Sequence, residues 1–326
     1  MGIDKTPSVA LAGAILGALT TWAQAQPAPT FSAQVEVVQI LATVRDQSGR
    51  LVNDLDKEDF ILEEEGERQT IQFFSRQSDL PLILGLLVDT SMSQRRILES
   101  EREASFQFFE QVLRPEEDLA FVVGFDVEVA LLEDLTGSRR KLLAALEDLR
   151  VPTRDGAGSL PPIGTVLFDA VFLAADEVLR DQAGRKALVL ISDGVDFGSM
   201  VSAEEAIEAA QRADSIIYGI RYYDAGSYRF PARRKWRRRR RKPTADGQKT
   251  LKQLSVETGG SLFEVDKKQT LKQIFERIQE ELRSQYSIGY TPAANHPGSG
   301  FRRLRLKTRN GALRVQSRTG YYPKSS

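Results

Sequence analysis

The sequence contains no cysteine and a single histidine, His296. Without cysteine the chain has no disulfides, thiol nucleophiles or thiolate metal ligands of its own. With one histidine, a Ser-His-Asp triad and a multi-histidine zinc site are close to excluded, and we interpret His296 as a plain loop residue. The formal net charge is +0. The chain as a whole therefore has no general attraction to nucleic acid or membranes.

A long apolar run is also missing. The most apolar stretch near the N-terminus, Val9–Trp22, has about 14 residues, fewer than the ~20 that span a bilayer. Lys5 precedes it and Ala23-Gln24-Ala25 follows it, which is typical of a signal peptide over residues 1–25 with cleavage after Ala25. An uncleaved membrane anchor is the alternative. We expect a secreted or periplasmic protein with no transmembrane segment after cleavage.

The distribution of apolar residues predicts two kinds of domain. Residues 26–79 and 284–326 carry short alternating, β-branched segments that indicate strands. Between them, over residues 80–283, unbroken apolar runs alternate with amphipathic helical patterns, as in a doubly wound α/β domain with a mostly parallel sheet. Each β part is too small to bury a core alone. We therefore predict one small all-β sandwich-like domain, made from both termini, into which the α/β domain is inserted.

Two local patterns refine this prediction. Ile97, Ala104, Phe108 and Val112 recur at helical spacing and predict a helix over residues 93–113. Near the C-terminus, Asn310-Gly311 separates two alternating segments and predicts a β-hairpin turn.

Oxygen-bearing side chains follow the predicted buried strands. They are Asp89, Ser91 and Ser93 in DTSMS, Thr165 after Gly164, and Asp193 and Asp196 in SDGVD. Each group alone is explained by a helix cap or a turn. In a doubly wound sheet, however, the carboxyl ends of the strands form the binding edge. Hard oxygen ligands without His or Cys suit Mg²⁺, Mn²⁺ or Ca²⁺ rather than zinc, and a low ligand charge leaves the cation open to one more anionic ligand.

DTSMS, Thr165 and SDGVD together resemble the metal-ion-dependent adhesion site of von Willebrand factor A-type (VWA) domains. The resemblance covers residues 80–283 and implies the doubly wound fold. It implies that the hydroxyls of Ser91, Ser93 and Thr165 reach Mg²⁺ or Mn²⁺ directly or through water. Asp89 and Asp193 would coordinate the metal or accept hydrogen bonds from its waters, and an Asp or Glu of a protein partner would complete the coordination.

Asp196 stands where VWA domains often carry an aspartate that supports the ligands without touching the metal. The flanks carry a resemblance as well. ATVRD (42–46), LDKEDF (55–60), YSIGY (286–290) and the final GYY (320–322) are similar to exported VWFA-related domain proteins of Acidobacteria.

One segment is strongly basic. RRKWRRRRRK, residues 233–242 within a predicted insert over 226–246, has nine basic residues in ten. A like-charged block is typical of a solvated loop. The alternative is an arm for a polyanion such as an acidic protein, a polysaccharide, lipid head groups or nucleic acid, with Trp236 available for stacking. The candidate anion-binding residues are Arg233, Arg234, Lys235, Arg237, Arg238, Arg239, Arg240, Arg241 and Lys242.

Three functions fit these observations. The leading one is an exported binding protein that captures an acidic partner through a divalent cation. A Mg²⁺-dependent phosphohydrolase with Asp89 as nucleophile is the enzymatic alternative, although Ser91 replaces the second aspartate of the D-x-D pattern and no G-x-x-x-x-G-K-[ST] loop is present. The third is a structural envelope protein with a vestigial site.

Overall fold

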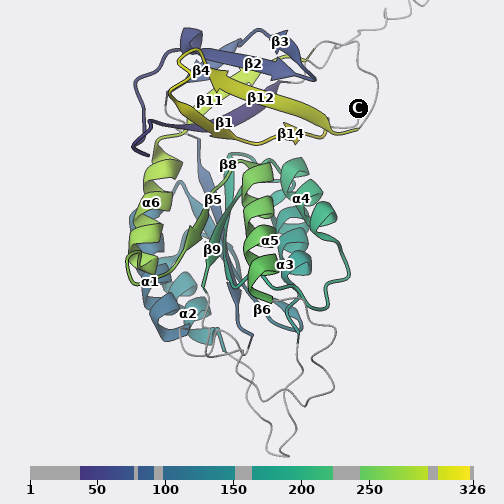
Figure 1. The fold of residues 1–326 in the computed structure, drawn as a ribbon. Helices are drawn as coiled ribbons and strands as arrows, with labels where there is room; N and C mark the ends of the chain where they lie inside the picture. The colour runs from purple at the N-terminus through teal and green to yellow at the C-terminus, as the bar shows by residue number, and fades with distance from the viewer. Residues whose placement is uncertain are drawn as a thin grey trace, which may run out of the picture. The chain divides into compact units, whose positions relative to one another are not determined.

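The computed structural model describes residues 37–76, 80–91, 98–150, 164–222, 243–292 and 300–323 (Figure 1). The predicted signal peptide, Ser93, His296 and the basic segment 233–242 lie outside these ranges. Within them, no helix is both long and apolar enough to cross a membrane.

A six-stranded sheet forms the centre of the α/β region. Its order is β10-β9-β8-β5-β6-β7, and all neighbours are parallel except β6 and β7. The strands are β5 (Leu82–Asp89), β6 (Leu119–Phe125), β7 (Val129–Thr136), β8 (Arg185–Ser192), β9 (Ser215–Arg221) and β10 (Leu262–Glu264). Every residue of β5 and β8 is buried, as their unbroken apolar runs predict for strands covered on both faces.

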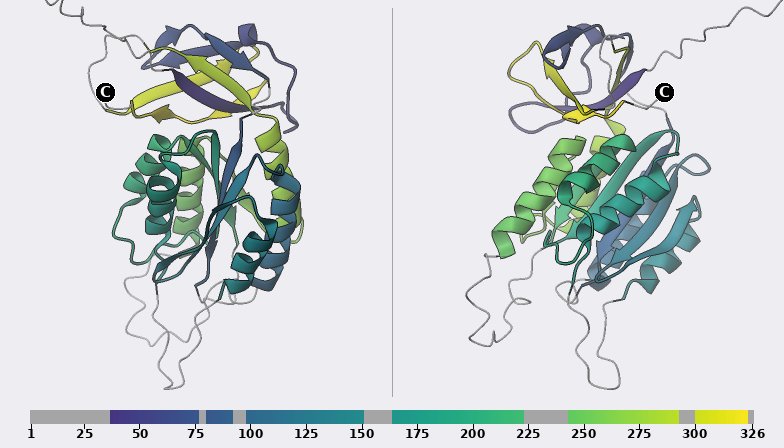
Figure 2. Two further views of the ribbon diagram at one scale, coloured as in Figure 1. Left: turned by 180° about the vertical axis from the view of Figure 1, so that it is seen from behind. Right: turned by 90° about the vertical axis from the view of Figure 1, so that its right-hand side faces the viewer.

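Helices cover both faces of this sheet (Figures 1 and 2). One face packs against α1 (Leu98–Val112), α2 (Arg139–Asp148) and α6 (Leu271–Arg283). The other packs against α3 (Leu167–Leu173), its π-helical continuation η3 (Ala174–Leu179), α4 (Ala203–Arg212) and α5 (Pro243–Thr258). The predicted doubly wound, mostly parallel α/β architecture is confirmed.

Strands from the two ends of the chain pair with each other in two further sheets, ordered β13-β1-β11-β4 and β14-β12-β2-β3. The inward side chains of both sheets share one core, which includes Ile40, Phe60 and Tyr286. This confirms that strands before and after the α/β region pack together, while the predicted domain boundaries stay predictions. The elements are β1 (Val38–Arg45), η1 (Lys57–Asp59), β2 (Phe60–Glu64), β3 (Glu67–Gln69), β4 (Phe73–Ser75), β11 (Tyr286–Tyr290), β12 (Arg302–Thr308), β13 (Arg314–Ser317) and β14 (Gly320–Tyr321).

The hairpin predicted at Asn310-Gly311 is wrong. A turn is present, because the Leu313 N–H donates to the Asn310 carbonyl at 3.1 Å. The strands that it connects nevertheless belong to different sheets: β12 pairs with β2 and β14, whereas β13 pairs with β1. β2 occupies one edge of β12, β14 pairs on the other edge only at Arg302 and Arg303, and β13 crosses to the edge of β1. The turn carries the chain from one sheet to the other.

At the amino edge of the six-stranded sheet, where β5, β6 and β8 begin, a buried acid ties strand starts together. The Asp118 carboxylate accepts hydrogen bonds from the Leu82 N–H (2.7 Å), the Arg114 N–H (2.8 Å) and the Arg114 guanidinium. Burial raises the pKa of Asp118, but these hydrogen bonds outweigh it and hold the pKa below its ordinary value. The charge of Asp118 is therefore part of the fold.

Candidate metal centre

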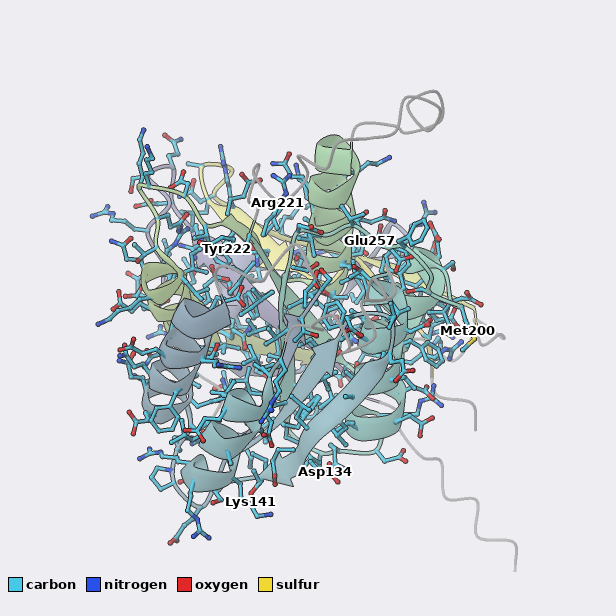
Figure 3. The ribbon with its side chains drawn as sticks, turned by 90° about the horizontal axis from the view of Figure 1, so that it is seen from below. Asp134, Lys141, Met200, Arg221, Tyr222 and Glu257 are labelled. Carbon is cyan, nitrogen blue, oxygen red and sulfur yellow. The ribbon has the colours of Figure 1, made fainter. Side chains whose placement is uncertain are left out.

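The carboxyl ends of β5 and β8 bring two acidic side chains together. These strands are adjacent and parallel, with Val88 opposite Ile191. β5 ends at Asp89, and Asp193 directly follows the last residue of β8. Both side chains are buried, and the charge of Asp193 acts on Asp89. Figure 3 views the molecule from below, with Arg221, the last residue of β9, and Met200 labelled.

Hydrogen bonds fix the orientation of Asp89. Its Oδ1 accepts from the Ser91 N–H at 2.9 Å, and its Oδ2 accepts from the Ser192 hydroxyl at 2.7 Å. The Ser192 hydroxyl in turn accepts from the Gly194 N–H at 3.0 Å. Ser192 thereby couples the end of β5 to the turn after β8. The sequence analysis missed this serine, although it directly precedes Asp193.

The turn after Asp193 requires glycine. Gly194 has a φ of +81°, which lies in the left-handed region, and a Cβ there would collide with the Gly247 carbonyl of α5. The Asp193 Oδ1 accepts from the Val195 N–H at 2.9 Å and closes the turn. The Asp-Gly pair thus lets the chain leave β8 sharply while α5 packs directly against it.

Thr165 lies at the same edge, between the segments that follow β6 and β8. It forms a two-way backbone bridge with Phe197, with N···O distances of 3.1 and 2.9 Å. The next N–H, of Val166, donates to the Asp126 carbonyl at 2.7 Å. The Thr165 hydroxyl donates to the Gly164 carbonyl at 2.8 Å, which leaves its oxygen lone pairs available for a cation.

Asp196 holds the loop after β8 against α3. Its Oδ1 accepts from the Ser199 hydroxyl at 2.5 Å and from the Phe168 N–H at 3.4 Å. Asp169, in the first turn of α3, accepts from the Met200 N–H at 2.9 Å. These contacts suit a residue that supports the site and is not itself a ligand.

Glu101, in the first turn and a half of α1, is a third acid of this region that the sequence analysis missed. Its side chain is 1% exposed. The signal was present in the sequence, because Glu101 falls between Ile97 and Ala104 on the face predicted to be apolar. A charged residue in such a stripe indicates either a buried partner or a function.

The electrostatics of this edge are unfavourable for an isolated protein. Burial and then the charge of Asp193 raise the pKa of Asp89 to about 7, although hydrogen bonds from Ser91 and Ser192 lower it. Burial and then the charge of Asp89 raise the pKa of Glu101 well above its ordinary value. Among the described residues, no lysine or arginine forms an ion pair with either acid. Two buried acids thus have no counter-charge from the described part of the chain.

The donor set fits a hard divalent cation. Asp89, Ser91 and Asp193 lie together, and Thr165 lies at the same edge, whereas Ser93 falls outside the described residues. These groups offer carboxylate and hydroxyl oxygens, the ligands that Mg²⁺ and Mn²⁺ prefer. In the part of the chain that is described, no three His, Cys, Asp or Glu side chains form a ready-made cage. A cation here would therefore depend on hydroxyls and water as well as on carboxylates.

Neither a family model nor a curated protein matches the sequence. Solved structures that resemble the chain include the vWF domain of the type V pili tip protein Mfa5 from Porphyromonas gingivalis (14% identity, 62% of this chain and 94% of that chain, TM-score 0.45). Another is BatB from Bacteroides thetaiotaomicron (17%, 62% and 97%, TM-score 0.42). A third is proximal thread matrix protein 1 from the mussel byssus, with a zinc-occupied MIDAS motif (15%, 65% and 47%, TM-score 0.45).

Two of these structures are a vWF domain and a protein with a MIDAS motif, the class of domain that the motifs of this chain resemble. Identities and TM-scores this low carry no function from those proteins to this one. What the chain does has to be inferred from its own site.

Proposed function

We propose that this chain is a binding protein that captures an acidic group of a protein partner through a divalent cation, Mg²⁺ or Mn²⁺, at the carboxyl edge of the sheet. The observation that carries the proposal is the close pair of buried acids, Asp89 and Asp193, at which no lysine or arginine of the described residues forms an ion pair with Asp89. A buried charge of this kind is costly unless a counter-ion accompanies it.

The residues at this edge have the chemistry that such a site needs. Asp89 and Asp193 would supply the negative charge, and Ser91, Ser93 and Thr165 would supply neutral oxygens. A bound cation would offer a coordination position that attracts an anionic oxygen. Two carboxylates do not fill the coordination shell of the cation, and neutral hydroxyls and waters complete it. The carboxylate of a partner can replace one of those waters as the last ligand.

The geometry of Asp89 favours this role over catalysis. A nucleophilic carboxylate needs an oxygen that reaches substrate. Asp89 is 1% exposed, and each of its oxygens accepts a hydrogen bond from Ser91 or Ser192. Such an arrangement orients a metal ligand.

An apolar surface lies next to this site. The loop after β8 is held to α3 by Asp196 and Asp169, yet the side chains of Phe197 and Met200 are 63% and 93% exposed. Phe197 is bridged to Thr165 through the backbone. A rigid loop that presents exposed apolar side chains is suited to contact a partner. We therefore propose that the captured acidic residue has an apolar neighbour.

The proposal is tested with immobilised peptides that each contain one Asp or Glu in varied surroundings, paired with Asn or Gln versions. Binding is measured in about 2 mM Mn²⁺, a concentration that suits a weak site, and is measured again after EDTA has removed the metal. We expect binding of acidic peptides, strongest beside apolar residues, that EDTA and the Asn or Gln replacement both abolish. Binding that survives EDTA would contradict the proposal.

Two further predictions concern segments outside the described residues. We propose, as a secondary surface, that residues 233–242 attract polyanions, in which case binding to heparin falls steeply between about 50 and 300 mM NaCl. Export through the predicted signal peptide is likewise a proposal, and the N-terminal sequence of the secreted chain would test it.

A further inference from the structure

Within the described part of the chain, the Glu101 carboxylate has no hydrogen-bond partner. Its two carboxylate oxygens are both buried, and neither finds a donor among the described residues. The hydroxyl of Ser105, one turn further along α1, is also buried without a partner. Two polar groups on the same face of one helix are thus left unsatisfied side by side.

This is an expensive arrangement for a purely structural residue. Buried polar groups are almost always hydrogen-bonded, and an exception calls for an explanation such as an ion or water that belongs there. The same face of α1 carries Phe108 in the core, so an apolar residue such as leucine would suit this face better than an acid. The first turns of a helix favour negative charge, but this effect provides no donor to the oxygens.

The location of Glu101 suggests what the missing partner is. α1 follows the DTSMS segment, and the charge of Asp89 acts directly on Glu101. Glu101 therefore lies in the buried region around Asp89, on which the charge of Asp193 also acts. No three acids of the described residues converge closely enough to bind one ion directly, which makes contact through an ordered water the appropriate geometry.

We propose that Glu101 is a third acidic group of the metal centre, which accepts a hydrogen bond from a water bound to the cation. Ser105 lies one turn away and provides a second polar group for ordered water. This inference rests on the metal site proposed above. A third negative charge lets the centre hold its cation when no partner carboxylate is present. Glu101 is thus a positioning residue that retains the metal between encounters with a partner.

The test compares two substitutions on the same helix. Glu101→Gln keeps the size of the side chain and removes its charge, and Glu103→Gln makes the same change at an exposed position. Mn²⁺ affinity is measured by calorimetry on the full chain, and the melting temperature is measured without metal. We expect Glu101→Gln to weaken Mn²⁺ binding about tenfold or more and to leave the metal-free melting temperature unchanged or higher. Glu103→Gln should alter neither.

The outcomes separate this inference from the metal site itself. If the wild type binds Mn²⁺ and Glu101→Gln binds it equally well, Glu101 plays no part in the centre and the inference is overturned while the site stands. If the wild type binds no Mn²⁺, the site fails and the inference fails with it. If Glu101→Gln does not fold, the Mn²⁺ affinity and metal-free melting temperature of Glu101→Leu, which suits an apolar helix face, are measured in its place and decide between the same outcomes.

Discussion

The buried acids at the two edges of the six-stranded sheet differ in their hydrogen-bond partners and in the direction in which their pKa is shifted. At the amino edge, Asp118 accepts hydrogen bonds from Leu82 and Arg114 on both of its oxygens, and its pKa is lowered. At the carboxyl edge, the donors that the described residues offer Asp89 are neutral, the same residues offer Glu101 no donor, and the pKa of each acid is raised. All three acids are shielded from solvent, and they differ in their hydrogen-bond partners as well as in how strongly burial raises the pKa.

This difference separates structural from functional acids. An acid with a protein cation stabilises the fold, and removing its charge should be harmful. An acid without one burdens the metal-free fold, and removing its charge should relieve the protein. The same chemical change, Asp to Asn, is therefore expected to have opposite signs at the two edges.

The largest effect is expected at the amino edge. Asp118→Asn removes the charge that Arg114 and the Leu82 N–H bind, and should lower the free energy of unfolding by about 3 kcal/mol. Urea denaturation at pH 7 measures it. Glu117→Gln is the control, since Glu117 also pairs with Arg114 but is exposed, and should cost less than about 0.5 kcal/mol. Equal losses of stability in the two variants would contradict the structural role of the Asp118 charge.

The stability that the Asp118 charge supplies should depend on pH. The folded pKa of Asp118 lies below its ordinary value of 3.8, so the unfolded chain binds a proton more readily than the folded one. The stability that Asp118 supplies is therefore fully present above its unfolded pKa and is lost as the pH falls through the folded pKa. The difference between wild type and Asp118→Asn should be constant from about pH 5 to 8 and shrink below about pH 4. A difference that grows in acid would contradict this assignment.

At the carboxyl edge, Asp89→Asn should raise the free energy of unfolding of the metal-free protein by about 1 kcal/mol, because it removes a buried charge without a counter-ion. The same variant should no longer gain stability from Mn²⁺. Denaturation in EDTA and in Mn²⁺ measures both quantities. A metal-free loss as large as that of Asp118→Asn would show that Asp89 serves the fold.

The smallest effect on stability is expected at the exposed loop. Phe197→Ser should change the free energy of unfolding by less than about 0.5 kcal/mol, since the side chain is largely exposed, but should weaken Mn²⁺-dependent capture of acidic peptides. Val256→Ser is the matched control. Val256 is also exposed, but it lies near the end of α5 that meets the start of β9, away from the carboxyl ends of the strands. Equal peptide binding by both variants would exclude Phe197 from the docking surface.

Much of this architecture was predictable from the sequence. The run LILGLLV indicated a strand buried on both faces, and parallel strands bring their carboxyl ends together, which predicted Asp89 and Asp193 at the same edge. The choice of sheet by β13 was not predictable, because it depends on which strand edges remain open. Glu101 lay on a predicted apolar face. That its carboxylate finds no donor among the described residues could be seen only in the structure, because the sequence does not show which donors surround it.

Whether the carboxyl edge binds a divalent cation is measured by titrating the chain with Mg²⁺ and Mn²⁺ up to millimolar concentration, with thermal unfolding as the readout and Asp193→Ala as the control. We expect the melting temperature of the wild type to rise and saturate, because the ligand binds only the folded state, and that of Asp193→Ala to stay constant. A wild type that gains no stability from either metal, or a variant that gains as much, would contradict this expectation.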